Sequence, residues 1–420
     1  MRTRPSREGA PSSGSTLWEI VVVDGCAGER SGGVTLGQLL QELDVAAPYE
    51  LVEVCDRWLR KSVDARACTL LLVDYSQSNM EPVPDTGNGS TGQSHAVTTG
   101  PAGAAYREQR VVVEVHNRHG RIAGVVVYLP VTIRSERIGV LMVELPGPPP
   151  VEVRETLADV ARVLAHVLAG ASRFTDRFEV LRRRRDLGLA AEIQWELLPV
   201  LAYELPAFSI AGALEPTYDI GGDTFDYAVS ASRLTVSITD AVGHGLRAAL
   251  LGSLAVTAMR NARRCGGRMV QQASAANEHL VEQFPGSSYV TGLILELDIP
   301  AGTGGIVNAG HPPPLLLREG SVRHLPLSPD LPLGLYGDTV HRRQELDLRP
   351  GDRLLLITDG ISEAHVTGLP AFGVERVEAL LTAHAHRPPV EFVRHLTQEV
   401  VNYRAGQLTD DATAVCLDWH

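Results

Sequence analysis

The sequence predicts an α+β protein with more than one domain, and three observations support this prediction. The chain has 420 residues, which is too long for one comfortable core and indicates two or three domains. Both helical and strand-like apolar patterns occur, and a helical stretch over residues 147–199 separates two strand-rich regions. Apolar residues make up 44% of the chain and charged residues 21%, as in ordinary globular proteins.

Composition excludes several classes of function. The net charge of −12 argues against a nucleic-acid partner, because binding to phosphate backbones requires basic patches. No apolar run reaches the roughly 18 residues that a membrane span needs, and the early apolar stretch is interrupted by Glu19 and Asp24, unlike a signal peptide. The five cysteines are scattered without CxxC spacing, which is typical of a reducing compartment. We expect a cytoplasmic protein with no membrane span.

The N-terminal third predicts a small sensor-like α/β module over residues 47–146. Residues 1–46 are expected to be disordered at first and show no clear pattern afterwards. Helical spacing over Pro48–Val63 precedes the strand-like run CTLLLVDY, and a polar loop is expected from Ser76 to about Gly103. Three strand patterns then follow at Val111–Val115, Ile122–Leu129 and Ile138–Leu145.

Residues 147–199 are predicted to form one long connecting helix. The prolines at 146 and 148–150 end the last strand of the module, and the pattern that follows is helical to Leu198. A long helix with an apolar stripe is usually a connector or a dimer seam. We therefore expect this helix to pair with its counterpart in a homodimer.

Acidic residues recur in one context within the strand-rich region 200–420. Each ends an apolar run and lies next to a glycine, a second acid or a polar turn; the residues are Asp223, Asp226, Asp240, Asp359, Asp410 and Asp411. Ends of neighbouring strands lie side by side, so these acids can converge on one point. Convergent carboxylates repel unless a cation neutralises them, and their oxygens suit magnesium or manganese. The pattern predicts a divalent metal site.

Plainer interpretations exist for each motif taken alone. A single Asp after a strand is usually a turn former or a helix N-cap. His244, in the turn GHG, is typical of a turn or core histidine as well as of a catalytic group, and GHGLRAA lacks the last glycine of a dinucleotide-binding fingerprint. The segment NAGHPPP, Asn308–Pro314, is interpreted as a rigid turn between strands.

Five motifs carry a resemblance to a known family. GGDTFD, ITDAVGHGLRAALL, VNAGHPPPLLL, LLLITDGISEA and LTDDATAV resemble, in order and approximate spacing, the metal-dependent serine/threonine phosphatases of type 2C (the PPM family), in their bacterial SpoIIE-like, stress-response branch. The resemblance covers about Glu192–Asp418, and residues 47–145 resemble a GAF sensor domain. It implies an N-terminal GAF-like domain, a connecting helix and a C-terminal αββα phosphatase sandwich over residues 200–420.

The resemblance also implies a role for each acid. Asp240 would bridge two divalent cations, manganese or magnesium, and the carbonyl of Ala241 would add one ligand to the first ion. Asp359 and Asp410 would hold the second ion, and Asp223 would reach the first ion directly or through water.

The implied catalytic residues are Asp240, Asp223 and His244. Two such ions activate a water for in-line attack on phosphorus without a covalent intermediate. The family also has a histidine that protonates the leaving serine, but the turn DAVGHG is longer than the family's DGH, so the role of His244 stays open.

Four further residues have supporting roles by the same resemblance. Asp226 and Asp411 are expected beside the ligands rather than among them. Gly222 and Gly360 are expected to allow close packing of the backbone.

The implied function is a serine/threonine protein phosphatase acting on a phosphorylated regulatory protein, such as an anti-anti-sigma factor, under control of an N-terminal sensor that receives a small-molecule or protein signal. One alternative is a signalling scaffold that keeps the fold with weak or no turnover; the intact acids count against it. Another is a phosphoesterase for small molecules such as nucleotides, which the lack of a P-loop or base-binding motif disfavours. No evident cofactor set exists among Cys55, Cys68, His116 and His119.

Overall fold

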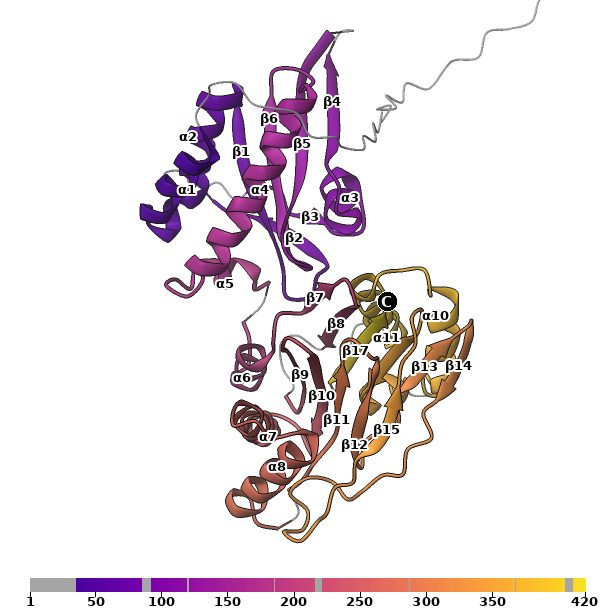
Figure 1. Ribbon diagram of the computed structural model, residues 1–420. Helices are drawn as coiled ribbons and strands as arrows, with labels where there is room; N and C mark the ends of the chain where they lie inside the picture. The colour runs from indigo at the N-terminus through magenta and orange to yellow at the C-terminus, as the bar shows by residue number, and fades with distance from the viewer. Residues whose placement is uncertain are drawn as a thin grey trace, which may run out of the picture. The chain divides into compact units, whose positions relative to one another are not determined.

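The computed structural model describes residues 35–84, 92–118, 121–184, 186–215, 221–286, 288–366, 368–404 and 411–420. They fall into two compact units (Figure 1). The first comprises described residues up to 72, together with 80–131 and 139–176, and the second comprises 73–79, 132–138 and the chain from 177 onward.

The first unit is built on a six-stranded sheet with the strand order β3-β2-β1-β6-β5-β4. Strand β1 pairs antiparallel with β6, and β4 pairs antiparallel with β5. Its elements are α1 (Leu36–Val45), the 3-10 turn Pro48–Glu50, α2 (Leu51–Val63), β1 (Ala67–Val73), β2 (Asn79–Pro82), β3 (His95–Ala96), α3 (Gly100–Glu108), β4 (Val112–Arg118), β5 (Arg121–Ile133), β6 (Glu136–Leu145) and α4 (Val151–Ala171).

Helices α1, α2 and α4 pack against one another in this unit. Each buries an apolar stripe at helical spacing, for example Leu157, Val160, Ala161 and Leu164 on α4. Helix α4 therefore belongs to the core of the first unit.

Three predictions for the N-terminal half are corrected. The helix over 147–199 is not continuous: it is divided into α4, α5 (Arg177–Arg182) and α6 (Leu189–Leu197). The first break follows Ser172, whose hydroxyl donates to the Leu168 carbonyl, and Gly188 begins the third helix as its N-cap. Part of the segment 1–46 is helical, as α1, and residues 76–103 contain β2, β3 and the start of α3 rather than one loop.

The second unit is a sandwich of two antiparallel sheets (Figure 1). The five-stranded sheet has the order β15-β12-β11-β10-β9, and the six-stranded sheet has the order β14-β13-β16-β17-β8-β7. After α5 and α6 the elements are β7 (Ala202–Leu205), β8 (Phe208–Glu215), β9 (Asp223–Val229), β10 (Arg233–Ala241), α7 (Leu246–Arg264), α8 (Met269–Gln283), β11 (Val290–Asp298), β12 (Thr303–Ala309), β13 (Leu315–Arg318), β14 (Ser321–His324), β15 (Gln344–Asp347), β16 (Arg353–Ile357), α9 (Asp359–Ser362), α10 (Val374–Ala383), α11 (Pro389–Tyr403) and β17 (Ala412–Trp419).

Alternation along the strands divides the second unit into layers. On β11, Leu293 and Leu295 face the core between the sheets, whereas Ile294 faces α7 and α8 on the outside. The outer face of the six-stranded sheet packs in the same way on α10 and α11. The predicted αββα arrangement of the C-terminal domain is confirmed.

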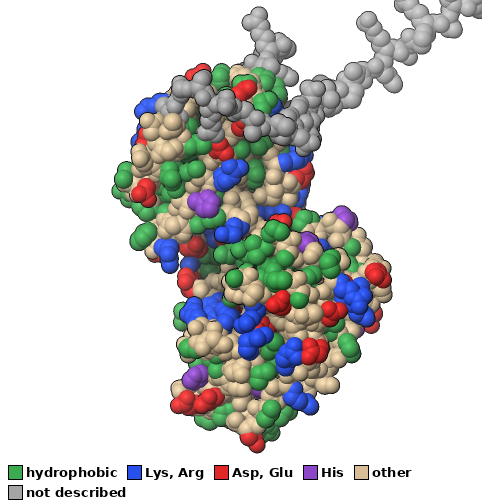
Figure 2. Space-filling view, in the orientation of Figure 1, with side chains coloured by type: hydrophobic (Ala, Val, Ile, Leu, Met, Phe, Trp, Pro, Cys, Tyr) green, Lys and Arg blue, Asp and Glu red, His purple; other side chains and the backbone are tan. Residues whose placement is uncertain are grey.

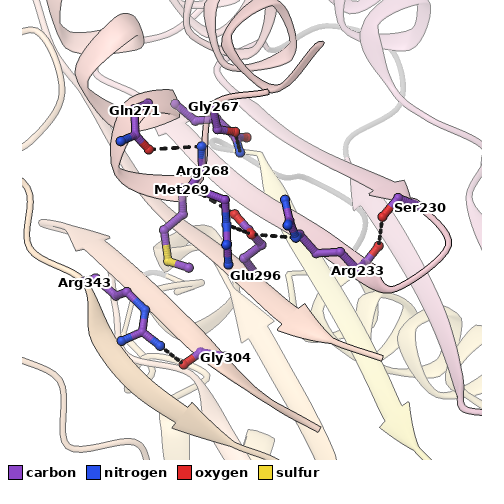
Figure 3. Close-up of polar contacts among 10 residues, drawn as sticks. Ser230, Arg233, Gly267, Arg268, Met269, Gln271, Glu296, Gly304 and Arg343 are labelled. Carbon is purple, nitrogen blue, oxygen red and sulfur yellow. Dashed lines mark hydrogen bonds and ion pairs between the residues drawn. The ribbon is translucent and has the colours of Figure 1, made fainter. Parts of the chain in front are cut away.

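A buried carboxylate fastens α8 to the five-stranded sheet. Glu296 on β11 is 2% exposed and accepts hydrogen bonds from the Arg268 guanidinium and from the backbone N–H of Met269, the latter at 3.0 Å. Arg233 on β10 adds an ion pair at 3.0 Å, so the carboxylate lies between two arginines (Figure 3). The chain itself neutralises this charge.

On the visible face of the second unit, acidic and basic side chains are interspersed (Figure 2).

Among the described residues, none of the helices combines the length and the apolar character that a membrane span requires.

Candidate active site

One end of the core between the two sheets is polar because the inward-facing positions change from apolar to acidic there. Val236 and Ile238 on β10 face the core, so the alternation directs Asp240 to the same face. Its register partners on the neighbouring strands are Asp223 and Thr291. Residues directly opposite each other in antiparallel strands share a face, so these three side chains form one row across the sheet.

The six-stranded sheet ends in the same way. Leu354 and Leu356 on β16 face the core, as do Val415 and Leu417 on β17. Continuing the alternation leads to Thr358 just after β16, to Thr413 at the start of β17 and to Asp411 just before it. These three polar residues are buried.

Hydrogen bonds join the two polar ends. The Thr358 hydroxyl donates to Asp223 Oδ2 at 2.6 Å and accepts from the Thr413 backbone N–H at 3.0 Å. The Asp223 backbone N–H donates to Asp411 Oδ2 at 3.2 Å. Asp411, expected beside the ligands, therefore contacts the predicted ligand Asp223.

Burial and like charge act together on Asp223. Its side chain is 3% exposed, and burial raises its pKa well above the ordinary value, with the negative charges of Asp240 and Asp411 raising it further. The hydrogen bond from Thr358 opposes the rise without cancelling it. A carboxylate in this position requires either a proton or a nearby cation.

His311 supports the same row from the side. Its Nδ1 lies 2.9 Å from the Thr291 hydroxyl, and its Nε2 lies 3.1 Å from the Ile357 carbonyl of the opposite sheet. The Asn308 side chain donates from Nδ2 to the His311 carbonyl at 3.0 Å and accepts at Oδ1 from the His311 backbone N–H at 2.8 Å. Burial lowers the pKa of His311 to about 4, which keeps the ring neutral. The segment NAGHPPP thus forms the rigid connection that was predicted, with its histidine fixed between the sheets.

The polar end opens into a cleft of about 1100 Å³. Its lining includes the acids Asp240, Asp359 and Glu363, and residues of the segment 329–342, among them Leu331, Tyr336 and Val340. Those three side chains are exposed apolar residues. The part of the lining from segment 329–342 was not predicted, because this segment is a loop without a strand or helix pattern.

The donor chemistry at this end fits divalent cations. Asp223 and Asp240 are adjacent, Asp359 lines the same cleft as Asp240, and a cation would reduce the repulsion that Asp240 and Asp411 exert on Asp223. Within the described ranges, no three His, Cys, Asp or Glu side chains are close enough to hold a metal ion. Asp410, the predicted fourth ligand, lies outside the described residues.

Gly222 and Gly360 allow two backbone segments to pack closely, as predicted. A Cβ at Gly222 would lie 3.1 Å from the carbonyl oxygen of Ala241, the predicted backbone ligand, and a Cβ at Gly360 would lie 1.8 Å from the carbonyl oxygen of Asp411. No side chain fits at Gly360 without moving the start of β17.

Two further predicted residues, His244 and Asp226, are not part of the acidic row. His244 is exposed in the turn between β10 and α7. Asp226 lies three residues after Asp223 on β9, so its side chain points to the opposite face of the sheet. There it accepts hydrogen bonds from Arg260 and Arg263 of α7, each at 2.8 Å. The prediction that it lies beside the ligands is wrong. It anchors α7 to the outer face of the sheet.

Gln194 was not predicted as part of the site. It lies on α6, is 3% exposed, and bonds the polar end directly. The signal available in the sequence was a polar residue within the apolar context of AAEIQWELLP.

A two-sheet sandwich with acids at one end of its core is the fold and site expected of metal-dependent phosphatases. Residues 230–420 match the family model described as Stage II sporulation protein E (SpoIIE). The phosphoserine phosphatase RsbP of Bacillus subtilis is 28% identical over 190 residues, which are 44% of this chain and 46% of RsbP. The phosphoserine phosphatase RsbU of the same organism is 23% identical over 237 residues, 56% of this chain and 70% of RsbU.

Among solved structures, the RsbU and RsbW domains of a Mycobacterium tuberculosis protein align with 29% identity over 51% of this chain and 61% of that one, with a TM-score of 0.44. The aligned residues span about half of the length of RsbP. The residues that match the SpoIIE family model belong to the second unit.

Proposed function

We propose that this protein is a metal-dependent protein serine/threonine phosphatase whose second unit carries the reaction. The observation that carries the proposal is the row formed by Asp223 and Asp240, which opens beside Asp359 onto a large cleft. Asp240 and Asp359 lie within residues 230–420, which match the SpoIIE family model, and the chain is similar to two phosphoserine phosphatases.

In this proposal Asp223, Asp240, Asp359, Asp410 and the Ala241 carbonyl hold two divalent cations, manganese or magnesium. When bound, such ions supply an activated water at neutral pH and neutralise the charge that develops on the phosphoryl oxygens.

The chain's own residues set the positions of these ligands. Thr358 holds one oxygen of Asp223, and neutral His311 fixes Thr291 beside Asp240. The cleft receives the phosphorylated segment of the substrate. His244, in the turn after β10, is the candidate proton donor to the leaving serine.

The substrate and the control follow from the resemblance. We propose a phosphorylated regulatory protein of the anti-anti-sigma type as substrate, a GAF-like first unit as sensor, and a homodimer formed through residues 147–199. Light scattering tests the dimer, because a monomer at every concentration would contradict it.

The test of the function is hydrolysis of a phosphoserine peptide by the full chain with manganese, run beside nucleoside phosphates. We expect turnover of the peptide that a chelator stops. Faster release of phosphate from the nucleotides would point to a small-molecule phosphoesterase. Manganese binding without turnover of any phosphoester would support the scaffold alternative.

A further inference from the structure

The cleft beside the acidic row is lined by several acids and by one arginine. Among the described residues of the lining, five are aspartate or glutamate, and Arg342 alone is a lysine or arginine. His311 lines the cleft too, but burial lowers its pKa to about 4 and keeps it neutral. A phosphorylated segment is an anion that the acids of the lining repel, so Arg342 is the lining side chain that attracts it.

A buried carboxylate holds Arg342 in place. The side chain of Asp330 is 4% exposed, whereas that of Arg342 is 67% exposed. Asp330 Oδ1 accepts from Arg342 Nε at 2.7 Å and lies 2.5 Å from Nη2. Asp330 Oδ2 accepts from the backbone N–H of Arg342 at 2.7 Å. One carboxylate therefore fixes both the main chain and the guanidinium of Arg342.

The loop that carries this pair is fastened to the five-stranded sheet. The Asp330 backbone N–H donates to the carbonyl of Asn308 on β12 at 2.8 Å. Leu333 exchanges two backbone hydrogen bonds with Val290 at the start of β11, each at 2.9 Å. Val290 directly precedes Thr291, whose side chain belongs to the row beside the cleft. Backbone contacts therefore set the position of the pair relative to the acidic row.

Part of the guanidinium remains for a ligand. A guanidinium has five N–H donors in a planar fork, and the contacts of Arg342 with Asp330 use Nε and Nη2. The Nη1 side is therefore available. Because Asp330 is buried and most of Arg342 is exposed, the pair presents its positive end to the cleft. An arginine held in this way binds phosphate and carboxylate groups with defined geometry.

The next residue in the sequence is also an arginine, but its contacts differ. Arg343 donates to the Gly304 carbonyl at 2.7 Å (Figure 3) and pairs with Glu345. It is not among the described residues that line the cleft. Two adjacent residues thus carry the same charge, and Arg342 is the one that lines the cleft. Arg343 is therefore a matched control for the charge of Arg342.

We propose that Arg342 binds an anionic group of the phosphoprotein substrate in the cleft. The group is the phosphoryl group itself or a carboxylate beside the phosphoserine, since a guanidinium recognises both through the same fork. Arg342 contacts the substrate, and Asp330 is a positioning residue that acts through Arg342. This role of Arg342 rests on the proposed function for the reaction at the acidic row.

The experiment compares the steady-state kinetics of the full chain, Arg342→Gln, Arg342→Lys and Arg343→Gln with manganese. The substrates are a phosphoserine peptide with neutral flanking residues, the same peptide with acidic flanking residues, and p-nitrophenyl phosphate. We expect kcat/KM of Arg342→Gln to fall roughly 10-fold on the acidic peptide, mainly through KM, because the lost hydrogen bonds are to a charged group. Arg342→Lys should show an intermediate loss, since it keeps the charge without the fork. Arg343→Gln should match the wild type.

The three substrates distinguish the two sources of the anion. A loss on all three assigns the contact to the phosphoryl group, which they share. A loss confined to the acidic peptide assigns it to a carboxylate beside the phosphoserine. Asp330→Asn should lower kcat/KM on the same substrates as Arg342→Gln does, because it releases the guanidinium.

Unchanged kcat/KM of a folded Arg342→Gln chain on all three substrates would overturn the proposal, as would an equal loss in Arg343→Gln. Circular dichroism establishes whether the variants are folded. If Arg342→Gln does not fold, Arg342→Lys decides, and wild-type kcat/KM in that variant would overturn the proposal. Wild type that hydrolyses no phosphoester would refute the proposed function. Fluorescence anisotropy of the labelled peptides then tests Arg342 separately: weaker binding by Arg342→Gln is expected, and equal binding would overturn its role.

Discussion

Glu296 and Asp223 are buried carboxylates of the same sheet, 2% and 3% exposed, and their surroundings are opposite in charge. Glu296 is enclosed by Arg233, Arg268 and a helix N–H (Figure 3). Asp223 lies beside Asp240 and Asp411, whose charges raise its pKa. A buried charge is tolerated when it is paired. The chain supplies the positive partners of Glu296, whereas the neighbours of Asp223 add negative charge, so Asp223 requires either a proton or a cation.

The largest expected effect is the loss of activity on removing a carboxylate from the acidic row. Asp240→Asn should lower kcat by roughly 10³-fold, about 4 kcal/mol, because it removes the predicted bridging charge. Phosphopeptide hydrolysis with saturating manganese measures the effect. Glu296→Gln is the matched control, and an equal loss of activity in this variant would remove the distinction between the two carboxylates.

The next effect concerns His311, a buried group that is held neutral by its surroundings. Its pKa is lowered to about 4 from an ordinary value of 6.5. The unfolded chain therefore takes up a proton that the folded chain refuses, and stability is present above pH 6.5 and lost as the pH falls toward 4. The loss is about 3 kcal/mol. Urea unfolding of wild type and His311→Gln between pH 7 and pH 4.5 measures it; parallel curves for the two proteins would show that His311 does not titrate as described.

A smaller effect is expected at the paired carboxylate itself. Glu296→Gln should lower the free energy of unfolding by about 1 to 2 kcal/mol. The cost is limited because Arg233 and Arg268 are 40% and 57% exposed and stay hydrated. Glu345→Gln, in an exposed pair with Arg343, is the control, and we expect no measurable change there in urea unfolding. A greater loss for Glu345→Gln than for Glu296→Gln would contradict the assignment.

The smallest effect has the opposite sign. The pKa of Asp223 is higher in the folded chain than its ordinary value of 3.8. The free energy of unfolding therefore falls as the pH rises from 3.8 through the pKa that Asp223 has in the folded chain. Asp223→Asn removes this penalty, so without metal at neutral pH the variant should melt about 2 °C higher than wild type. With manganese the order should reverse, because binding stabilises only the protein that retains its ligand. A variant that melts lower than wild type in chelator would show that the row is not strained by like charge.

The layers and most of the acidic row could be predicted from the sequence. Alternation on β10 and β16 places inward-facing apolar residues ahead of Asp240 and Thr358, and the motifs around them indicated the strand ends. Gln194 could not be predicted in this way, because its partner Asp411 is 217 residues away along the chain. The breaks after Ser172 and before Gly188 were also missed, since the apolar stripe continues on both sides of them while local turns end the helices.

The most direct test of the central claim is an electron paramagnetic resonance titration that counts free manganese in the presence of wild type, Asp240→Asn and Glu296→Gln. The claim is that the adjacent carboxylates at the end of the core, and not the carboxylate of Glu296 between its two arginines, form a divalent-cation centre. It predicts two bound ions per wild-type chain, at least roughly 10-fold weaker binding by Asp240→Asn, and wild-type binding by Glu296→Gln. Equal binding by wild type and Asp240→Asn, or none by either, would contradict it.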